Sequence, residues 1–205
     1  MKRPMHTSLI VVDDFVNNAD ELRAAGLRLT YPDLKGPFPG RNSQERVPIT
    51  GLADIVSHLT GEKLRPIDPP HSHAKFRVSL AGERGAGRVH TDPGYWSGIL
   101  YMSRPEDCRG GTEFFRHIGT NSDRAPLDHE ELAAMGYPDY AAMQRELIDE
   151  QGTDESRWEP IMTVPMRFNR LVLLRPWLWH TAGPGFGDSI ENGRLIYVMF
   201  FDLAR

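Results

Sequence analysis

From about residue 74 onward, the sequence consists largely of short stretches of alternating polar and apolar residues separated by turn-forming residues. Successive side chains of a strand point to opposite faces, so this alternation predicts half-buried β-strands. In the stretch 75–81, three apolar side chains alternate with three polar ones, namely Phe76, Val78 and Leu80 with Lys75, Arg77 and Ser79. Further strands are predicted at 88–92, 98–103, 112–116, 161–164, 170–175, 178–181 and 194–202. Many short strands favour a sandwich or barrel, and the lack of regular strand–helix alternation argues against a parallel α/β sheet.

Helical patterns precede and interrupt this β-rich part. The N-terminal part is predicted to form a strand at 9–12, a helix at 17–29, a long loop at 31–48 and a short helix at 52–59. Residues 119–160 are acidic and helix-prone, with Asp128 as the expected N-cap of a helix reaching Met135 and a second helix over 140–150. We therefore expect one domain with an α+β, mainly β fold. Its parts would be a double-stranded β-helix (jelly-roll) core at 74–203, N-terminal helices within 8–60 that buttress it, and the helical insertion.

Composition narrows the function classes. The 205 residues include 40% hydrophobic and 25% charged residues, as in soluble globular proteins. The formal charge of −4 and the lack of a basic stripe argue against nucleic acid or an anionic membrane as a partner. The apolar run at 9–12 is too short for a signal-peptide core or a membrane span, so a cytoplasmic location is expected. The one cysteine, Cys108, excludes an intramolecular disulfide and a thiolate metal cage, and no local base would make it a catalytic thiol.

His90 and Asp92 are the first candidates for chemistry. Residues i and i+2 of a strand share a face, so this imidazole and carboxylate would project together just before Pro93 and Gly94. His180 ends an apolar stretch before a Gly/Pro turn, and it would complete a two-histidine, one-carboxylate facial triad. Such a triad holds a first-row metal with open coordination positions. Taken alone, the triplet at 90–92 also fits a turn that Asp92 caps.

A competing histidine pair lies at His71 and His73. It also has i, i+2 spacing, but it precedes its strand and has no carboxylate nearby. We therefore do not expect it to bind the metal.

Arg194 opens the last predicted strand. Alternation places it on one face with Ile196, Val198 and Phe200, and no acidic residue shares this face before Asp202. Burying a guanidinium on an apolar face is costly unless it is paired, and a bound carboxylate could pair with it in bidentate fashion.

The order of these motifs resembles that of the iron(II)/2-oxoglutarate-dependent oxygenases, in particular the prolyl-hydroxylase-like members. The resemblance covers about residues 74–203 and, more faintly, the segment "VVDDFVNNADELR". Its motifs in chain order are His90-x-Asp92, Gly110-Gly111-Thr112-Glu113-Phe114, His180 and Arg194. It implies that His90, Asp92 and His180 are the catalytic metal ligands for Fe(II), and that Arg194 binds the cosubstrate 2-oxoglutarate. It further implies that O₂ is consumed and 2-oxoglutarate is converted to succinate and CO₂, usually with hydroxylation of a substrate.

The resemblance suggests further roles around this centre. Tyr101, Arg77 and Thr112 are candidate cosubstrate-binding residues, and Ser79 could contact cosubstrate or substrate. Arg41 and Arg46 of the loop 31–48 are candidate substrate-binding residues, and this loop and the insertion 119–160 could wall the substrate site. Trp177 and Trp179 are expected to pack in the core. Asp92 argues against halogenation, because halogenating relatives usually replace this carboxylate, whereas desaturation and cyclisation use the same ligands.

Two other classes of protein share part of this pattern. A cupin-type metal enzyme would not use 2-oxoglutarate, but it usually has more histidine ligands and would leave Arg194 without a purpose. A noncatalytic jelly-roll module with a vestigial metal site is the alternative outside enzymes. The expected substrate is a small molecule such as an amino acid or natural-product intermediate, and the sequence does not indicate the oligomeric state.

Overall fold

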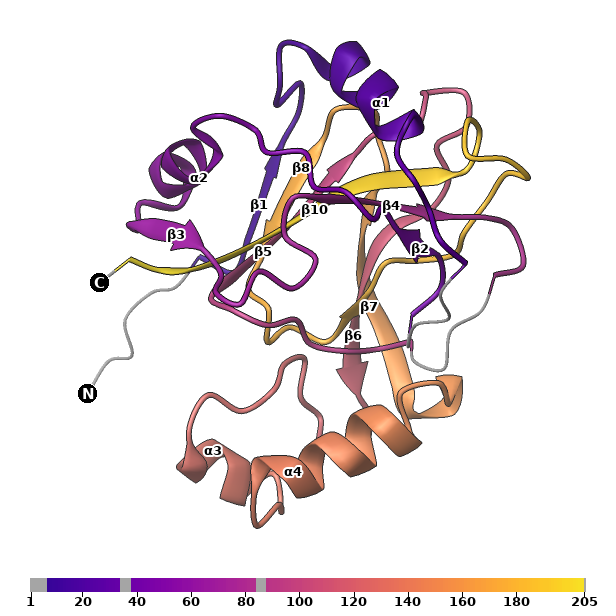
Figure 1. Cartoon of the computed structure of the whole chain (residues 1–205). Helices are drawn as coiled ribbons and strands as arrows, with labels where there is room; N and C mark the ends of the chain where they lie inside the picture. The colour runs from indigo at the N-terminus through magenta and orange to yellow at the C-terminus, as the bar shows by residue number, and fades with distance from the viewer. Residues whose placement is uncertain (1–6, 34–37, 84–87, 205) are drawn as a thin grey trace.

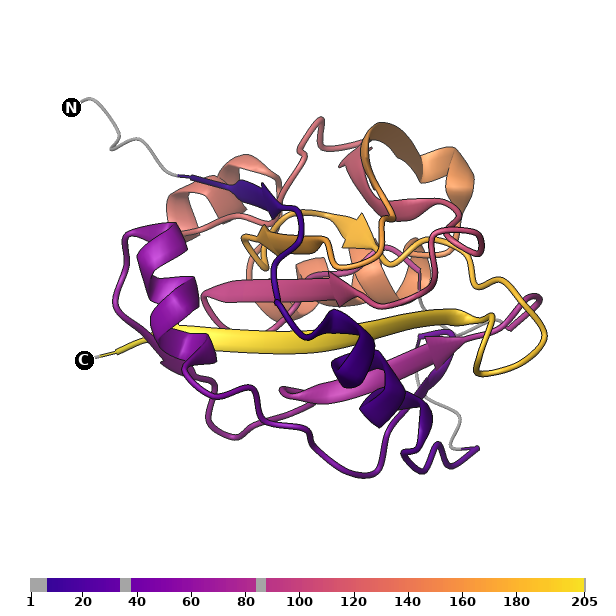
Figure 2. The same cartoon turned by 90° about the horizontal axis from the view of Figure 1, so that it is seen from above.

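The computed structural model describes residues 7–33, 38–83 and 88–204, and its main element is a seven-stranded sheet (Figure 1). The strand order is β1-β8-β5-β10-β4-β2, and β3 pairs with the far end of β10. The strands are β1 (Leu9–Val12), β2 (Arg41–Asn42), β3 (Leu64–Pro66), β4 (Lys75–Ser79), β5 (Trp96–Tyr101), β8 (Leu171–Leu174) and β10 (Arg194–Leu203). Figure 2 shows the long β10 running between β5 and β4.

A second, three-stranded sheet has the order β7-β6-β9, formed by β7 (Trp158–Pro165), β6 (Gly111–His117) and β9 (His180–Thr181). An isolated bridge between His90 and His180 extends it beyond β9. All strand pairs in the described ranges are antiparallel. The prediction of a mainly β protein without a parallel α/β sheet is therefore confirmed.

The central strands β5, β8 and β10 of the large sheet are buried on both faces, because they carry mostly apolar residues at consecutive positions. On one face, α1 (Ala19–Leu27) and α2 (Leu52–Thr60) contribute to a hydrophobic cluster with Phe76, Leu100 and Tyr197. On the other face, alternate residues of β5 and β10 pack with residues of the smaller sheet. This second cluster includes Ile99, Tyr101, Ile196 and Val198 from the large sheet and Phe114 and Val164 from the small one. The space between the two sheets is where the polar site residues lie.

The insertion 119–160 forms helices on the side of the molecule opposite α1 (Figure 1). It contains α3 (His129–Ala134) and α4 (Tyr140–Met143), which continues as a π-helix over Gln144–Glu150, and a short 3₁₀-helix over Glu155–Arg157. Asp128 caps α3 as expected, since its carboxylate accepts a hydrogen bond from the Glu131 N–H. Leu132, Met143 and Leu147 pack against Trp158 and Trp179, so the insertion has its own apolar contact with the small sheet.

Some predicted elements differ from the structure. The strand expected at 88–92 is reduced to the single bridge at His90, and the strand expected at 178–181 to His180–Thr181. The bends at 93–95 and the turn at 176–177 take the chain out of the ladder beside these residues. Strands β2 and β3 were not predicted, since two or three residues carry no readable alternation. Four residues of the expected loop, 34–37, lie outside the described residues. None of the helices in the described ranges combines the length and the apolarity needed to cross a bilayer.

Candidate metal centre

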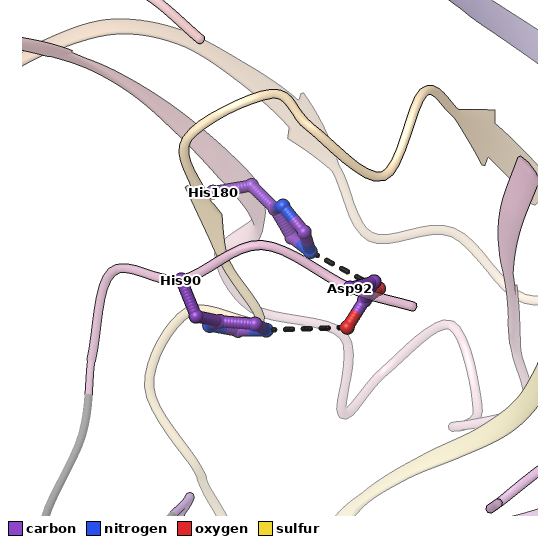
Figure 3. Close-up of side chains that lie close together, drawn as sticks. All are labelled: His90, Asp92 and His180. Carbon is purple, nitrogen blue, oxygen red and sulfur yellow. Dashed lines mark ion pairs between the residues drawn. The ribbon is translucent and has the colours of Figure 1, made fainter. Parts of the chain in front are cut away.

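His90, Asp92 and His180 converge at the edge of the small sheet, where the bridge between the two histidines brings distant parts of the chain together. The Asp92 carboxylate faces both imidazoles from one side (Figure 3). Its Oδ1 is 3.6 Å from His90 Nε2, and its Oδ2 is 3.3 Å from His180 Nε2. All three side chains are largely buried.

The two imidazoles are oriented by the same local hydrogen bond. His90 Nδ1 lies 2.8 Å from the carbonyl oxygen of Arg88, and His180 Nδ1 lies 2.8 Å from that of Leu178. A carbonyl can only accept, so each Nδ1 carries a proton and donates. In the neutral tautomer this leaves the Nε2 lone pair facing Asp92, as in metal-ligating histidines.

The surroundings of Asp92 favour the ionised form of its carboxylate, and they would accommodate a positive charge beside it. Burial raises the pKa of Asp92, but the two histidines outweigh it and bring this pKa down to about 2. Burial, together with the nearby His180, lowers the pKa of His90 to about 4. For His180, burial lowers the pKa, but the contact with Asp92 more than offsets this and leaves it above its ordinary value. The centre therefore holds one carboxylate charge that a cation can neutralise.

The geometry fits a transition metal. One donor atom from each of the three residues lies within 4.8 Å of the others, and no other group in the described ranges meets this condition with three possible ligands. Two donors bound at right angles, each about 2.1 Å from a metal, are about 3 Å apart, close to the two distances to Asp92. His71 and His73 are not part of this group. Instead, His73 Nδ1 accepts a hydrogen bond from the Phe200 N–H.

Arg194 is buried as its alternation pattern predicts, with only 1% of its surface exposed. It opens β10 opposite Ser79 of β4, and its guanidinium carbon lies 5.8 Å from the centre of the Tyr101 ring. Its Nε and Nη2 atoms have no hydrogen-bond partner within the described structure. Because an unpaired buried guanidinium is costly, this position is suited to an anionic ligand.

A cavity of about 710 Å³ adjoins the three ligands. The loop expected at 31–48 supplies a wall made of Pro32, Phe38, Gly40, Asn42, Ser43 and Gln44. The insertion 119–160 supplies none of its lining, because its apolar side chains pack on the outside of the small sheet. Only the loop is therefore in position to wall a substrate site.

The other candidate residues lie in three different environments. Arg77 lines the cavity, whereas Tyr101 and Thr112 are fully buried and hydrogen-bonded to each other. Arg41 and Arg46 lie outside the cavity lining. Arg41 pairs with Glu83 at 3.3 Å, and the Arg46 guanidinium is occupied by backbone carbonyl oxygens of residues 70, 71 and 73.

Sequence reasoning missed most of the cavity lining, including Phe38 and Lys75. Phe38 packs on His90, with 4.1 Å between ring centres, and nothing in an irregular loop could have indicated this contact. Lys75 also lines the cavity, and here a signal existed, because Lys75 alternates onto the same strand face as Arg77. Trp179 packs in the core as expected, and Trp177 packs edge-on against Tyr95.

Comparisons with known proteins agree with this architecture. Three solved structures have the same overall fold, each with a TM-score of 0.52. They are HygX from Streptomyces hygroscopicus with nickel, 2-oxoglutarate and hygromycin B bound (15% identity, covering 97% of this chain and 84% of that one), the non-heme alpha-ketoglutarate-dependent epimerase SnoN from nogalamycin biosynthesis (16%, 96% and 79%) and the non-heme alpha-ketoglutarate-dependent carbocyclase SnoK from the same biosynthesis (15%, 95% and 79%). At these identities the likeness concerns the fold. No curated protein sequence matches significantly, and the profile of a family of unknown function (DUF6445) matches residues 3–201.

Proposed function

The chain belongs to the DUF6445 family, and we propose that it is an iron(II)- and 2-oxoglutarate-dependent oxygenase that hydroxylates a small molecule. The observation that carries this proposal is the combination of a two-histidine, one-carboxylate triad with the buried guanidinium of Arg194, whose Nε and Nη2 have no hydrogen-bond partner among the described residues. A triad by itself would also suit a metal enzyme that needs no cosubstrate. Together the two features provide a metal site and an anion site within one jelly-roll fold, which is what a metal-chelating dicarboxylate requires.

Each residue then has a defined task. His90, Asp92 and His180 would hold the iron through the two Nε2 atoms and one carboxylate oxygen. Arg194 would bind the distal carboxylate of 2-oxoglutarate, with the Tyr101 ring beside its guanidinium. The apolar side chains between the sheets exclude water from this region, which strengthens both interactions. When bound, iron(II) would supply O₂ activation coupled to decarboxylation of 2-oxoglutarate to succinate.

Two of the neighbouring structures support cosubstrate use but differ in outcome, since their names describe an epimerase and a carbocyclase. HygX was solved with 2-oxoglutarate and a small molecule, hygromycin B, bound. These names favour a small-molecule substrate for this chain. Hydroxylation is proposed because it is the usual outcome of this ligand set, and product analysis distinguishes it from epimerisation or ring closure.

To test this, Fe(II) and then 2-oxoglutarate are added to the protein without oxygen. The weak visible absorption of the iron–2-oxoglutarate chelate is then measured. O₂ is then admitted and succinate is measured. We expect both signals in the wild-type protein and in His58→Ala, which removes a helical histidine outside the cavity lining, and neither signal in His180→Ala. Metal binding without a response to 2-oxoglutarate would instead indicate a cupin-type enzyme. A protein that gives neither signal is a noncatalytic module.

A further inference from the structure

The inner face of β4 carries two cations on one side of the cavity. Lys75, Arg77 and Ser79 alternate along this face and lie opposite Val198, Ile196 and Arg194 of β10, respectively. Lys75 and Arg194 are therefore at opposite ends of the paired segment. Four residues of strand separate their positions by roughly 13 Å, so a carboxylate held by Arg194 does not also neutralise Lys75.

Arg77 is already committed to holding the loop. Its guanidinium donates to the carbonyl oxygens of Phe38 and Pro39 and to Asn42 Oδ1, the last at 2.9 Å. These acceptors are neutral, so they use its donors without cancelling its charge. Arg77 thus fixes the cavity wall and contributes positive potential to the cavity.

Lys75, in contrast, is available. It lines the cavity, and its ammonium has no hydrogen bond or ion pair with any side chain or carbonyl in the part of the chain that the structure describes. The pKa of Glu45 is lowered mainly by hydrogen bonds from Thr30 and only secondarily by the charge of Lys75, and Glu45 lies outside the cavity lining. The Glu45 carboxylate therefore does not bind the Lys75 ammonium from within the cavity.

Ser72 lies beside Lys75 in the turn before β4. Its oxygen accepts a hydrogen bond from Asn42 Nδ2 at 2.9 Å, which leaves its own proton for another acceptor. Both residues line the cavity, and the Lys75 N–H donates to the Ser72 carbonyl oxygen at 3.1 Å, so an ammonium and a hydroxyl belong to the same part of the lining.

The charges around the cavity are unbalanced. Asp92 is the one acidic side chain in the described lining, and it belongs to the metal centre. On the proposed function, the metal and 2-oxoglutarate account for Asp92 and Arg194, but they leave Arg77 and Lys75 without a counter-charge in the cavity. The donors of Arg77 are used by the loop, so Lys75 is the cation left to contact a ligand. Near Lys75 the lining turns apolar, with Ile99, Val198 and Phe200 on neighbouring strands.

We propose that Lys75 and Ser72 bind a carboxylate of the substrate, whose apolar body lies on Ile99, Val198 and Phe200. This inference rests on the proposed function, which supplies the neighbouring metal and cosubstrate. A single carboxylate fits better than a phosphate dianion, because one ammonium and one hydroxyl match a single negative charge. The substrate class is then an organic acid with an apolar portion next to its carboxylate.

The test uses matched acids and amides of the same shape. 3-Phenylpropanoate and 3-phenylpropanamide are titrated by calorimetry into the full-length protein loaded with Zn(II) and 2-oxoglutarate. We expect the wild-type protein to bind the acid roughly 10- to 100-fold more tightly than the amide, the range of one charge-assisted hydrogen bond. Lys75→Met should abolish this preference, and Lys75→Arg should retain it. Lys63→Met, which removes a lysine outside the cavity lining, should bind like the wild type.

A separate titration of 2-oxoglutarate into the Zn(II)-loaded protein distinguishes the two proposals. Lys75→Met should leave its affinity unchanged, and thermal unfolding confirms that the variant is folded. The subsite is refuted if the wild-type protein does not prefer the acid, if Lys75→Met keeps the preference, or if that variant loses affinity for 2-oxoglutarate. A wild-type protein that prefers the acid without binding 2-oxoglutarate would retain the subsite and refute the oxygenase.

Discussion

Tyr101 of β5 and Thr112 of β6 join the two sheets through a pair of buried hydrogen bonds. The Tyr101 hydroxyl accepts from the Thr112 N–H at 2.9 Å and lies 2.7 Å from Thr112 Oγ1. It also contacts the Val164 carbonyl at 3.3 Å. The hydrogen-bonding capacity of the Tyr101 hydroxyl is thus taken up by protein groups, and the Tyr101 ring flanks Arg194. These contacts favour a supporting role for Tyr101 over a direct hydrogen bond to a ligand.

Tyr101→Phe should therefore destabilise the protein. The substitution keeps the ring but leaves the buried Thr112 N–H without its acceptor, which costs about 1–3 kcal/mol. Urea unfolding should show this loss, whereas the exposed Tyr140→Phe should match the wild type. An unchanged free energy of unfolding in Tyr101→Phe would contradict the connecting role.

Gly111 is required by close packing between β6 and β7. A Cβ at this position would lie 1.9 Å from the Val164 carbonyl oxygen. This oxygen belongs to the backbone of β7, so moving it away would disturb the strand pairing. We expect Gly111→Ala to lower the free energy of unfolding by about 2–3 kcal/mol. The adjacent Gly110 has φ +60° but no atom closer than 3.6 Å to its would-be Cβ, so Gly110→Ala should cost only about 1 kcal/mol of strain. Equal losses in the two variants would show that the contact does not matter.

The sequence predicted the centre better than its surroundings, for a physical reason. Alternation depends only on neighbouring residues, so it correctly placed Arg194 on a buried apolar face. His90 and Asp92 do lie close together, but the strand that was expected to align them is reduced to the bridge at His90. The hydrogen bonds of the Arg46 guanidinium are made to carbonyl oxygens of residues 71 and 73, which approach it only after folding. The sequence around Arg46 could not indicate them. The contact of Phe38 with His90 is likewise tertiary.

Acid should weaken the protein through Glu62. Its carboxylate accepts two hydrogen bonds from Arg175, at 2.9 and 3.0 Å, and one from Trp96. Burial raises the pKa of Glu62, but these donors outweigh it and hold the pKa below its ordinary value. A carboxyl with a lowered folded-state pKa contributes stability that is complete above its unfolded value, about pH 4.3, and is lost as the pH falls through the folded value.

Glu62→Gln should consequently be less stable than the wild type at neutral pH, and the difference should shrink on acidification below about pH 4. Unfolding by urea at a series of pH values measures both curves, with the exposed Glu150→Gln as a surface control. A gap between wild type and Glu62→Gln that stays constant across this range would refute the assignment.

The two most deeply buried arginines should respond to substitution in opposite ways. Arg194 and Arg175 are 1% and 2% exposed, but Arg175 is paired with Glu62, whereas Arg194 has two unpaired nitrogen atoms in the described structure. Removing an unpaired buried charge relieves a desolvation cost, so Arg194→Met should leave the free energy of unfolding unchanged or raise it. Arg175→Met leaves the Glu62 carboxylate without its partner. It should lower the free energy of unfolding by roughly 2–4 kcal/mol, a range reduced because that carboxylate is partly exposed.

In the metal-loaded protein, Arg194→Met should also weaken 2-oxoglutarate binding roughly 10- to 100-fold, because a charge-assisted contact is lost. Parallel unfolding and calorimetric titrations of both variants measure this contrast, and a stability loss in Arg194→Met equal to that in Arg175→Met would mean that the guanidinium serves the fold rather than a ligand.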